Sequence, residues 1–151
     1  MKIDPIFEVQ NNKLYLIGGD EISLAAVQSV NASEFAANPD TVTEYITFVN
    51  VNWIDVGVED SYNEEFLANL RDALKALEEK QRFVIMNPVF ADGMGTAEDF
   101  TASMKHCARR IKDCVSVIGF EVPDVCNTES FVEELSAKHG HYIFFNGGVP
   151  L

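Results

Sequence analysis

The chain has 151 residues, of which 47% are hydrophobic and 23% charged, which suits one globular domain with its own core. Its 24 acidic residues outnumber the 11 lysines and arginines and give a formal net charge of −13. A field of that sign repels nucleic acid and anionic membrane surfaces, so we expect neither as a partner.

The sequence gives little support to membrane, secreted or metal-binding classes. No segment approaches the ~18 apolar residues that a membrane helix needs, and no apolar signal region follows the N-terminus. The three cysteines include no Cys-x-x-Cys pair, so we expect reduced thiols and no zinc site. These features predict a cytoplasmic protein, unless the chain is cut from a longer secreted precursor, and they predict no metal or cofactor.

The first third of the chain predicts a hairpin, an ambiguous segment and a helix. Residues Phe7–Ile17 read as two short strands around Asn11 and Asn12, because asparagine tolerates the positive φ of a tight turn. Residues 21–28 suit either a short strand or a helical turn. A capping residue at Asp40 and apolar residues at helical spacing predict a helix over 40–49.

The rest of the chain alternates strand-like and helix-like segments. Strands are predicted at 53–58, 83–88, 115–121 and 142–145, and helices at 64–79, 97–112 and 128–138. Such alternation is typical of βαβ units with a mainly parallel sheet, which places functional sites at the carboxyl ends of its strands.

One passage carries a resemblance to a known family. Ala108-Arg-Arg-Ile-Lys-Asp-Cys-Val-Ser-Val-Ile-Gly-Phe-Glu121 is similar to the fourth helix and strand of cellulase-like (β/α)8 glycosidases, where a member reads Ala-x-Arg-Tyr-Lys-Asp and then Val-Ile-Gly-Tyr-Glu. The resemblance covers residues 7–124. It implies that the hairpin plugs the barrel floor and that 21–28, 52–58 and 83–88 are the first three barrel strands.

The expected fold is therefore α/β, with an N-terminal β-hairpin followed by about five mainly parallel strands alternating with helices. We interpret residues 1–151 as a single truncated (β/α) barrel, the N-terminal part of a TIM-barrel-like glycoside hydrolase. An open parallel sheet leaves two edges and a partly covered inner face. A homodimer, or another protein partner, is the expected way to cover them.

The resemblance also implies where catalytic residues belong, and this chain departs from the pattern there. The family has an Asn-Glu-Pro triplet after its fourth strand, whose Glu is the acid/base, and its nucleophile lies on the seventh strand. An ungapped match puts Asp124 at the Asn position and Val125 at the Glu position. Only a gap would let Glu121 or Asp124 act instead, so we expect no catalysis and name these two as the catalytic candidates.

Polar residues at the predicted carboxyl ends define a candidate binding rim, suited to a sugar, a cation or another polar ligand. Its members are Glu59, Asp60, Asn87, Asp92, Glu121, Asp124 and Asn146. Polar residues also end strands simply because water is there. Glu121 lies within or at the end of a strong strand, where a carboxylate needs a partner, and Asn87 on the neighbouring strand is one candidate. Trp53 and Phe90 suit sugar stacking, but core packing is favoured.

Three functions remain open. The first is a glycoside-hydrolase-related, non-catalytic protein that binds a carbohydrate or a protein partner. The second is an active glycoside hydrolase completed by a second chain, with Glu121 as acid/base. The third is a regulatory domain similar to STAS proteins. Ile54-Asp-Val-Gly57 resembles the Ile-Asp-Ser-x-Gly loop of that family, although Val56 replaces the phosphorylated serine. Sequential strands with all helices on one face would separate the first two from the third.

Overall fold

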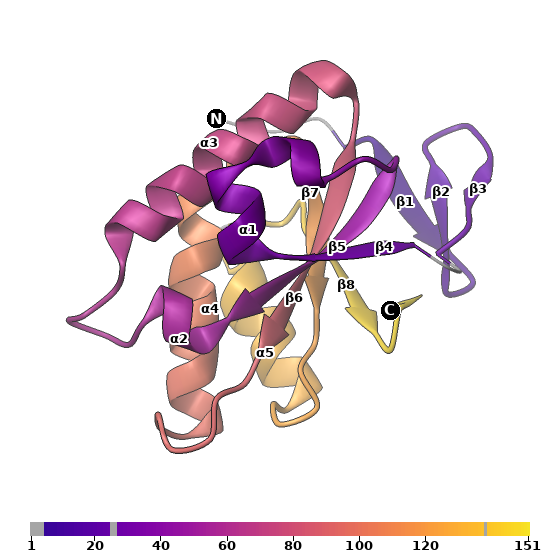
Figure 1. The fold of residues 1–151 in the computed structure, drawn as a ribbon. Helices are drawn as coiled ribbons and strands as arrows, with labels where there is room; N and C mark the ends of the chain where they lie inside the picture. Colours follow the sequence, from indigo (N-terminus) through magenta and orange to yellow (C-terminus); the bar gives the residue numbers. More distant parts are fainter. Residues whose placement is uncertain (1–4, 25–26, 138) are drawn as a thin grey trace.

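The computed structural model describes residues 5–24, 27–137 and 139–151, which form two sheets and a layer of helices (Figure 1). The antiparallel sheet has three strands: β1 Phe7–Gln10, β2 Lys13–Leu16 and β3 Glu21–Ile22. The second sheet has six: β4 Gln28–Asn31, β5 Ile46–Asn52, β6 Phe83–Val89, β7 Val117–Glu121, β8 Ile143–Asn146 and β9 Val149–Pro150. The α-helices are α1 Ala32–Ala37, α2 Trp53–Val56, α3 Glu64–Lys80, α4 Ala97–Arg110 and α5 Thr128–Ser136.

The larger sheet follows the order of the chain. Strands β4 to β8 pair with one another in sequence and in parallel, and β9 turns back antiparallel to β8. The helices lie on one side of this sheet, and the three-stranded sheet lies on the other (Figure 1). This partial barrel confirms the expected fold class. Its sequential order, with helices on one face, favours the barrel-type fold over the STAS-like one.

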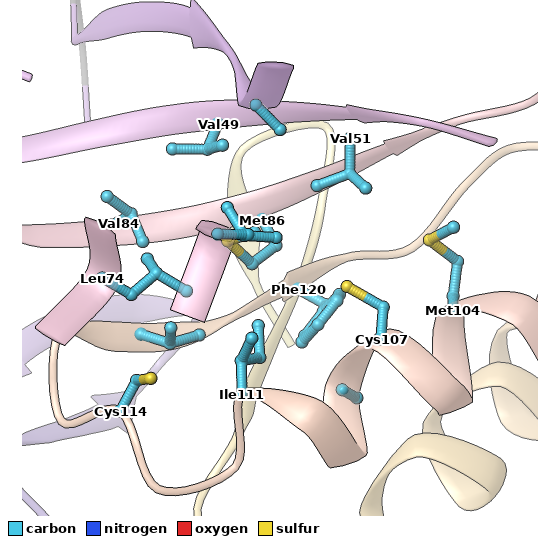
Figure 2. Packing of buried hydrophobic residues seen from close by; sticks show 14 of the residues in the cluster. Val49, Val51, Leu74, Val84, Met86, Met104, Cys107, Ile111, Cys114 and Phe120 are labelled. Atoms are coloured by element: carbon cyan, nitrogen blue, oxygen red, sulfur yellow. The ribbon is translucent and has the colours of Figure 1, made fainter. Parts of the chain in front are cut away.

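The core between the sheet and the helices is built from alternate residues of the strands. Figure 2 shows sheet residues facing side chains of α3, α4 and the loop after α4. The labelled contributors are Val49, Val51, Val84, Met86 and Phe120 from the sheet, with Leu74, Met104, Cys107, Ile111 and Cys114 opposite. The indole N–H of Trp53 donates a hydrogen bond of 2.9 Å to the Ser103 hydroxyl, which satisfies the polar atom of this fully buried ring.

A second core lies on the opposite, inner face of the sheet. Phe7 and Leu14 of the hairpin pack there against strand residues whose side chains alternate away from the helices. The strand residues are Ile46, Phe83, Ile85, Ile118 and Phe145. Asn11 and Asn12 adopt φ values of 53° and 61°, so the predicted hairpin turn is confirmed. The hairpin covers the half of the inner face that lies toward the amino ends of β5 and β6.

The predictions for residues 40–58 are wrong. The structure has a short 3₁₀ turn at Pro39–Thr41 and then strand β5, where a helix was expected, and helix α2 where a strand was expected. Strand β5 is buried on both faces, with Val49 and Val51 toward the helices and Ile46 and Phe48 inward. Such a run has apolar residues at helical as well as at strand spacing. The spacing of apolar residues alone therefore does not distinguish a strand from a helix here.

The first parallel strand lies later than expected. Residues Glu21 and Ile22 pair with β2 as part of the hairpin sheet, and the first barrel strand is β4. Helix α1, which follows it directly, was not predicted. Ala25 and Ala26, within the expected strand, and Lys138, the expected end of the last helix, lie outside the described residues.

The other predicted elements agree with the structure to within a few residues. Helices α3, α4 and α5 and strands β6, β7 and β8 all stand where the sequence placed them. Thr96 begins α4 with a capping box, in which its hydroxyl accepts from the Asp99 N–H and the Asp99 carboxylate accepts from the Thr96 N–H. Among the described residues, no helix is both long and apolar enough to cross a membrane.

Gly119 allows the close pairing of β7 with β8. A Cβ at this position would overlap the backbone of Ile143, whose carbonyl carbon would lie only 2.6 Å away. We expect Gly119→Ala to destabilise the fold by several kcal/mol, because neither backbone can move without breaking the ladder. Gly140→Ala is the matched control, since an added Cβ there meets nothing within 4 Å. Urea unfolding of both variants tests this, and equal midpoints would contradict it.

His141 predicts a loss of stability in mild acid. Burial, and secondarily His139, lower its pKa from the usual value of 6.5, and its Nε2 is buried without a hydrogen-bond partner among the described residues. Because the folded pKa is the lower one, this stabilisation is present above pH 6.5 and is lost as the pH falls toward the folded pKa. Wild type should therefore lose more unfolding free energy between pH 7.5 and 5.5 than His141→Gln does. Parallel pH profiles would contradict this.

Candidate functional site

A row of polar side chains crosses the inner face, on the side of the carboxyl ends. The side chains of Ser29, Asn50 and Asn87 come from the neighbouring strands β4, β5 and β6. The Asn87 amide donates a hydrogen bond of 2.9 Å to the Asn50 Oδ1 atom, and the Asn50 amide donates one of 3.0 Å to the Ser29 hydroxyl. Asn50 and Asn87 are half-buried and Ser29 is exposed.

This polar row begins where the inner core ends. Phe48 and Ile85 stand two residues before Asn50 and Asn87 on the same strands, and both pack into the inner core. Side chains two residues apart share one face of a strand, which places the amides beside that core. Each strand therefore changes from apolar to amide at the same level of the sheet.

Glu121 extends the row to the fourth parallel strand, β7. Met86 and Phe120 are paired in register, so Asn87 and Glu121 stand one residue further along adjacent strands. The Glu121 carboxylate accepts the Gly148 N–H at 2.9 Å through Oε1 and at 3.3 Å through Oε2. Its hydrogen-bonded partner is thus the turn between β8 and β9, whereas the Asn87 amide bonds to Asn50.

The turn that holds Glu121 depends on two glycines. Gly147 and Gly148 have φ values of 60° and 80°, which residues with a side chain rarely adopt. These two glycines therefore allow the tight turn that joins β8 to β9. The turn thereby brings the Gly148 N–H to the carboxylate. Glu121 and Asn146 are members of the predicted binding rim, but no role was predicted for this pair of glycines.

Five of the seven predicted rim residues do not join the row. Asp92 and Asp124 are exposed, in the turns after β6 and β7. Asn146 is exposed at the end of β8 and follows the inner-core residue Phe145, so by strand alternation it lies toward the opposite face. Asp124, one of the two catalytic candidates, is therefore separated in environment from the half-buried Glu121. Val125, which the ungapped match of the sequence puts at the expected acid/base position, is 46% exposed.

Glu59 and Asp60 lie with the helices. They were predicted to end a strand, but that segment is helix α2 and its following loop. Two residues further on, Tyr62 stacks on His106 of α4, with ring centroids 4.0 Å apart. Figure 1 shows the α2–α3 loop on the helical side of the sheet, so these two carboxylates are not brought together with Asn87 and Glu121.

Exposed aliphatic side chains lie at or just beyond the carboxyl ends of the consecutive strands β5 to β8. The exposed fractions are 71% for Ile54, 36% for Val89, 46% for Val125 and 49% for Val149. The two aromatic candidates are packed in the outer core: Trp53 is fully buried, and Phe90 contacts it with a centroid distance of 5.4 Å. The carboxyl end thus offers aliphatic contacts around the uncharged amides and the single carboxylate of the polar row.

The row provides hydrogen bonding and contains no metal centre. Amides offer donors and acceptors without charge, and the Glu121 carboxylate offers acceptors, which together suit a hydroxyl-rich ligand. Within residues 5–24, 27–137 and 139–151, no group of three or more His, Cys, Asp or Glu side chains is arranged to hold a metal ion.

The fold is similar to that of endocellulases. No family model and no curated protein matches the sequence. An endocellulase from the archaeon Pyrococcus horikoshii is similar in structure, with a TM-score of 0.60 and 14% identity, and a variant of that enzyme in complex with cellotetraose gives 0.62 and 13%. The catalytic domain of the major endoglucanase of Xanthomonas campestris gives 0.62 and 10%.

These comparisons show that the chain has the fold of part of a cellulase-like barrel. In each of the three, 93% of this chain is matched, and it spans 56% of the other chain. The expected resemblance to the N-terminal part of a glycoside hydrolase barrel is therefore confirmed at the level of structure. At 10–14% identity the likeness concerns the fold alone.

The contact between Glu121 and Gly148 predicts a local effect of mutation. Glu121→Ala removes the acceptor of the Gly148 N–H, so this amide should exchange with solvent at least about tenfold faster. Glu121→Gln keeps an acceptor and should change the rate less. Glu129→Ala, which changes an exposed residue of α5, is the control for the loss of one negative charge. Hydrogen exchange followed by NMR measures the rates, and an unchanged Gly148 rate in Glu121→Ala would contradict the assignment.

Proposed function

We propose that this chain is a glycoside-hydrolase-related protein without catalytic activity, which binds a carbohydrate on the carboxyl half of its inner face. The polar row of Ser29, Asn50, Asn87 and Glu121 is the observation that carries the proposal. It occupies the end of a parallel sheet at which such folds place their ligands.

The chemistry of the row suits a neutral sugar. Amide and hydroxyl groups exchange paired hydrogen bonds with sugar hydroxyls, and the bonds from Asn87 to Asn50 and from Asn50 to Ser29 fix the orientation of both amides. Phosphorylated or otherwise anionic sugars fit less well, because Glu121 and the net charge of −13 oppose them. The cellotetraose complex of the P. horikoshii enzyme supplies a first ligand to test.

The absence of catalysis rests on the residues that hydrolysis needs. Retaining and inverting glycosidases use two carboxyl groups, about 5 Å or about 6.5–9.5 Å apart, on either side of the bond. Glu121 is the one carboxylate in the row, and its oxygens already accept the Gly148 N–H. Val125, at the family's acid/base position, offers no proton.

The open edge of the sheet favours a second candidate, a glycoside hydrolase completed by another chain. Strand β4 pairs only with β5 among the described residues, so its outer edge is free to receive a strand. A second copy placed there would form a homodimer and could bring a carboxylate opposite Glu121. In that arrangement Glu121 is the acid/base.

A titration with cellotetraose, monitored by amide NMR shifts, tests the proposal. Wild type should show saturable shifts at residues of the row, and Asn87→Ala should bind at least tenfold more weakly, which corresponds to about 1.4 kcal/mol. The control is Asn69→Ala, an exposed asparagine of α3. No saturable shift with cellotetraose or with a panel of other neutral oligosaccharides would overturn carbohydrate binding.

A second measurement separates binding from hydrolysis. The proposal predicts that incubated oligosaccharides stay intact and that light scattering gives the same mass with and without sugar. Reducing ends that appear with wild type and are lost in Glu121→Gln would instead establish the completed hydrolase. A concentration-dependent dimer mass would then identify the second copy as the completing chain.

A further inference from the structure

A charged groove lies on the helical face, remote from the polar row. It has a volume of about 770 Å³ and runs between α3 and α4, with the loop after α4 at one end. Its lining consists of Leu67, Ala68, Arg71, Asp72, His106, Arg109, Arg110, Lys112 and Asp113. The groove and the polar row belong to opposite faces of the sheet, because the helices cover one face and the row stands on the other (Figure 1).

The charge of the groove contrasts with that of the chain. Four of the 11 lysines and arginines line it, although the formal net charge of the molecule is −13. Asp72 and Asp113 are the two carboxylates in the lining, and Glu64 lies against Arg110 at its border, so four basic side chains face three carboxylates before His106 is considered. A local cluster of this sign in an acidic molecule attracts anions that the remaining surface repels.

Two of the guanidinium groups are fixed in place. Arg71 donates through Nε at 3.2 Å and through Nη2 at 2.5 Å to the two carboxylate oxygens of Asp113, which leaves Nη1 available. The Nε atom of Arg110 lies 3.3 Å from Glu64, so both of its Nη atoms keep their donors. Groups held in this way lose little conformational entropy when a ligand binds.

The other two cations are exposed and have no such anchor. Within the described part of the chain, no ion pair joins Arg109 or Lys112 to an acidic residue. Compensation of the helix dipole accounts for Arg109 and Arg110, which lie in the last turn of α4. It does not account for Arg71, which lies in the interior of α3.

We propose that the α3–α4 groove binds a small ligand that carries at least two anionic oxygen groups, as polyphosphates and polycarboxylates do. The fixed guanidiniums of Arg71 and Arg110 supply paired N–H donors for one group, and Arg109 and Lys112 supply charge for the second. The ligand is recognised by its charge and by the spacing of its oxygens. This site is independent of the carbohydrate proposal.

Isothermal titration with inorganic tripolyphosphate and, separately, with citrate tests the groove. Wild type should bind one equivalent of at least one of them, and affinity should fall as salt rises. Arg109→Ala and Lys112→Ala should each weaken binding at least fivefold without unfolding the chain, because neither residue has an ion pair in the described structure. The preferred anion distinguishes a phosphate ligand from a carboxylate ligand.

Lys13→Ala is the matched control, since it removes one positive charge from an exposed side chain of the hairpin. It should leave the affinity within twofold of wild type, as should Asn87→Ala in the polar row. The absence of one-to-one binding to both probes would overturn the proposal. So would an equal loss in Lys13→Ala and Arg109→Ala, because it would show a general charge effect without a site.

Discussion

The burial of both faces of a parallel sheet is the constraint on which the structure depends. The helices cover the outer face, and β1 to β3 cover the inner face only toward the amino ends of the strands. Along β5 the inner side chains change from Ile46 and Phe48 to Asn50, and along β6 from Ile85 to Asn87. The uncovered part of the sheet is therefore polar and internally hydrogen-bonded, and water or a polar ligand can contact it without exposing the core.

Much of the fold was predictable because local signals and burial pointed to the same elements. Helices α3 and α4 combine capping residues with one apolar face, and β6 and β7 are short apolar runs between turns. The predictions failed at β5 and α2. There, a strand buried on both faces has no clear period, and the Trp53–Val56 helix is too short to show an apolar stripe.

That error explains what was missed at the site. Asn87 and Glu121 were named because β6 and β7 were placed correctly, and they do occupy neighbouring strands. Asn50 falls between the predicted helix over 40–49 and the predicted strand over 53–58, and Ser29 lies just beyond the expected first strand. The run Ile46-Thr-Phe-Val-Asn-Val51 is rich in β-branched and aromatic residues, and this strand propensity is the signal that could have placed Asn50 on the same face as Ile46 and Phe48. The Gly148 contact depends on a turn between β8 and β9 that no periodicity indicates.

Thiol labelling tests most directly whether the carboxyl half of the inner face is open in solution. Asn87→Cys, in a Cys126→Ser background, introduces a thiol into the polar row. The native Cys107 serves as the buried reference, because burial raises its pKa to about 12 and its side chain is inaccessible. The account predicts that a maleimide modifies position 87 much faster than Cys107. Equal protection of both thiols in the folded protein would show that the inner face is covered, and would contradict the account.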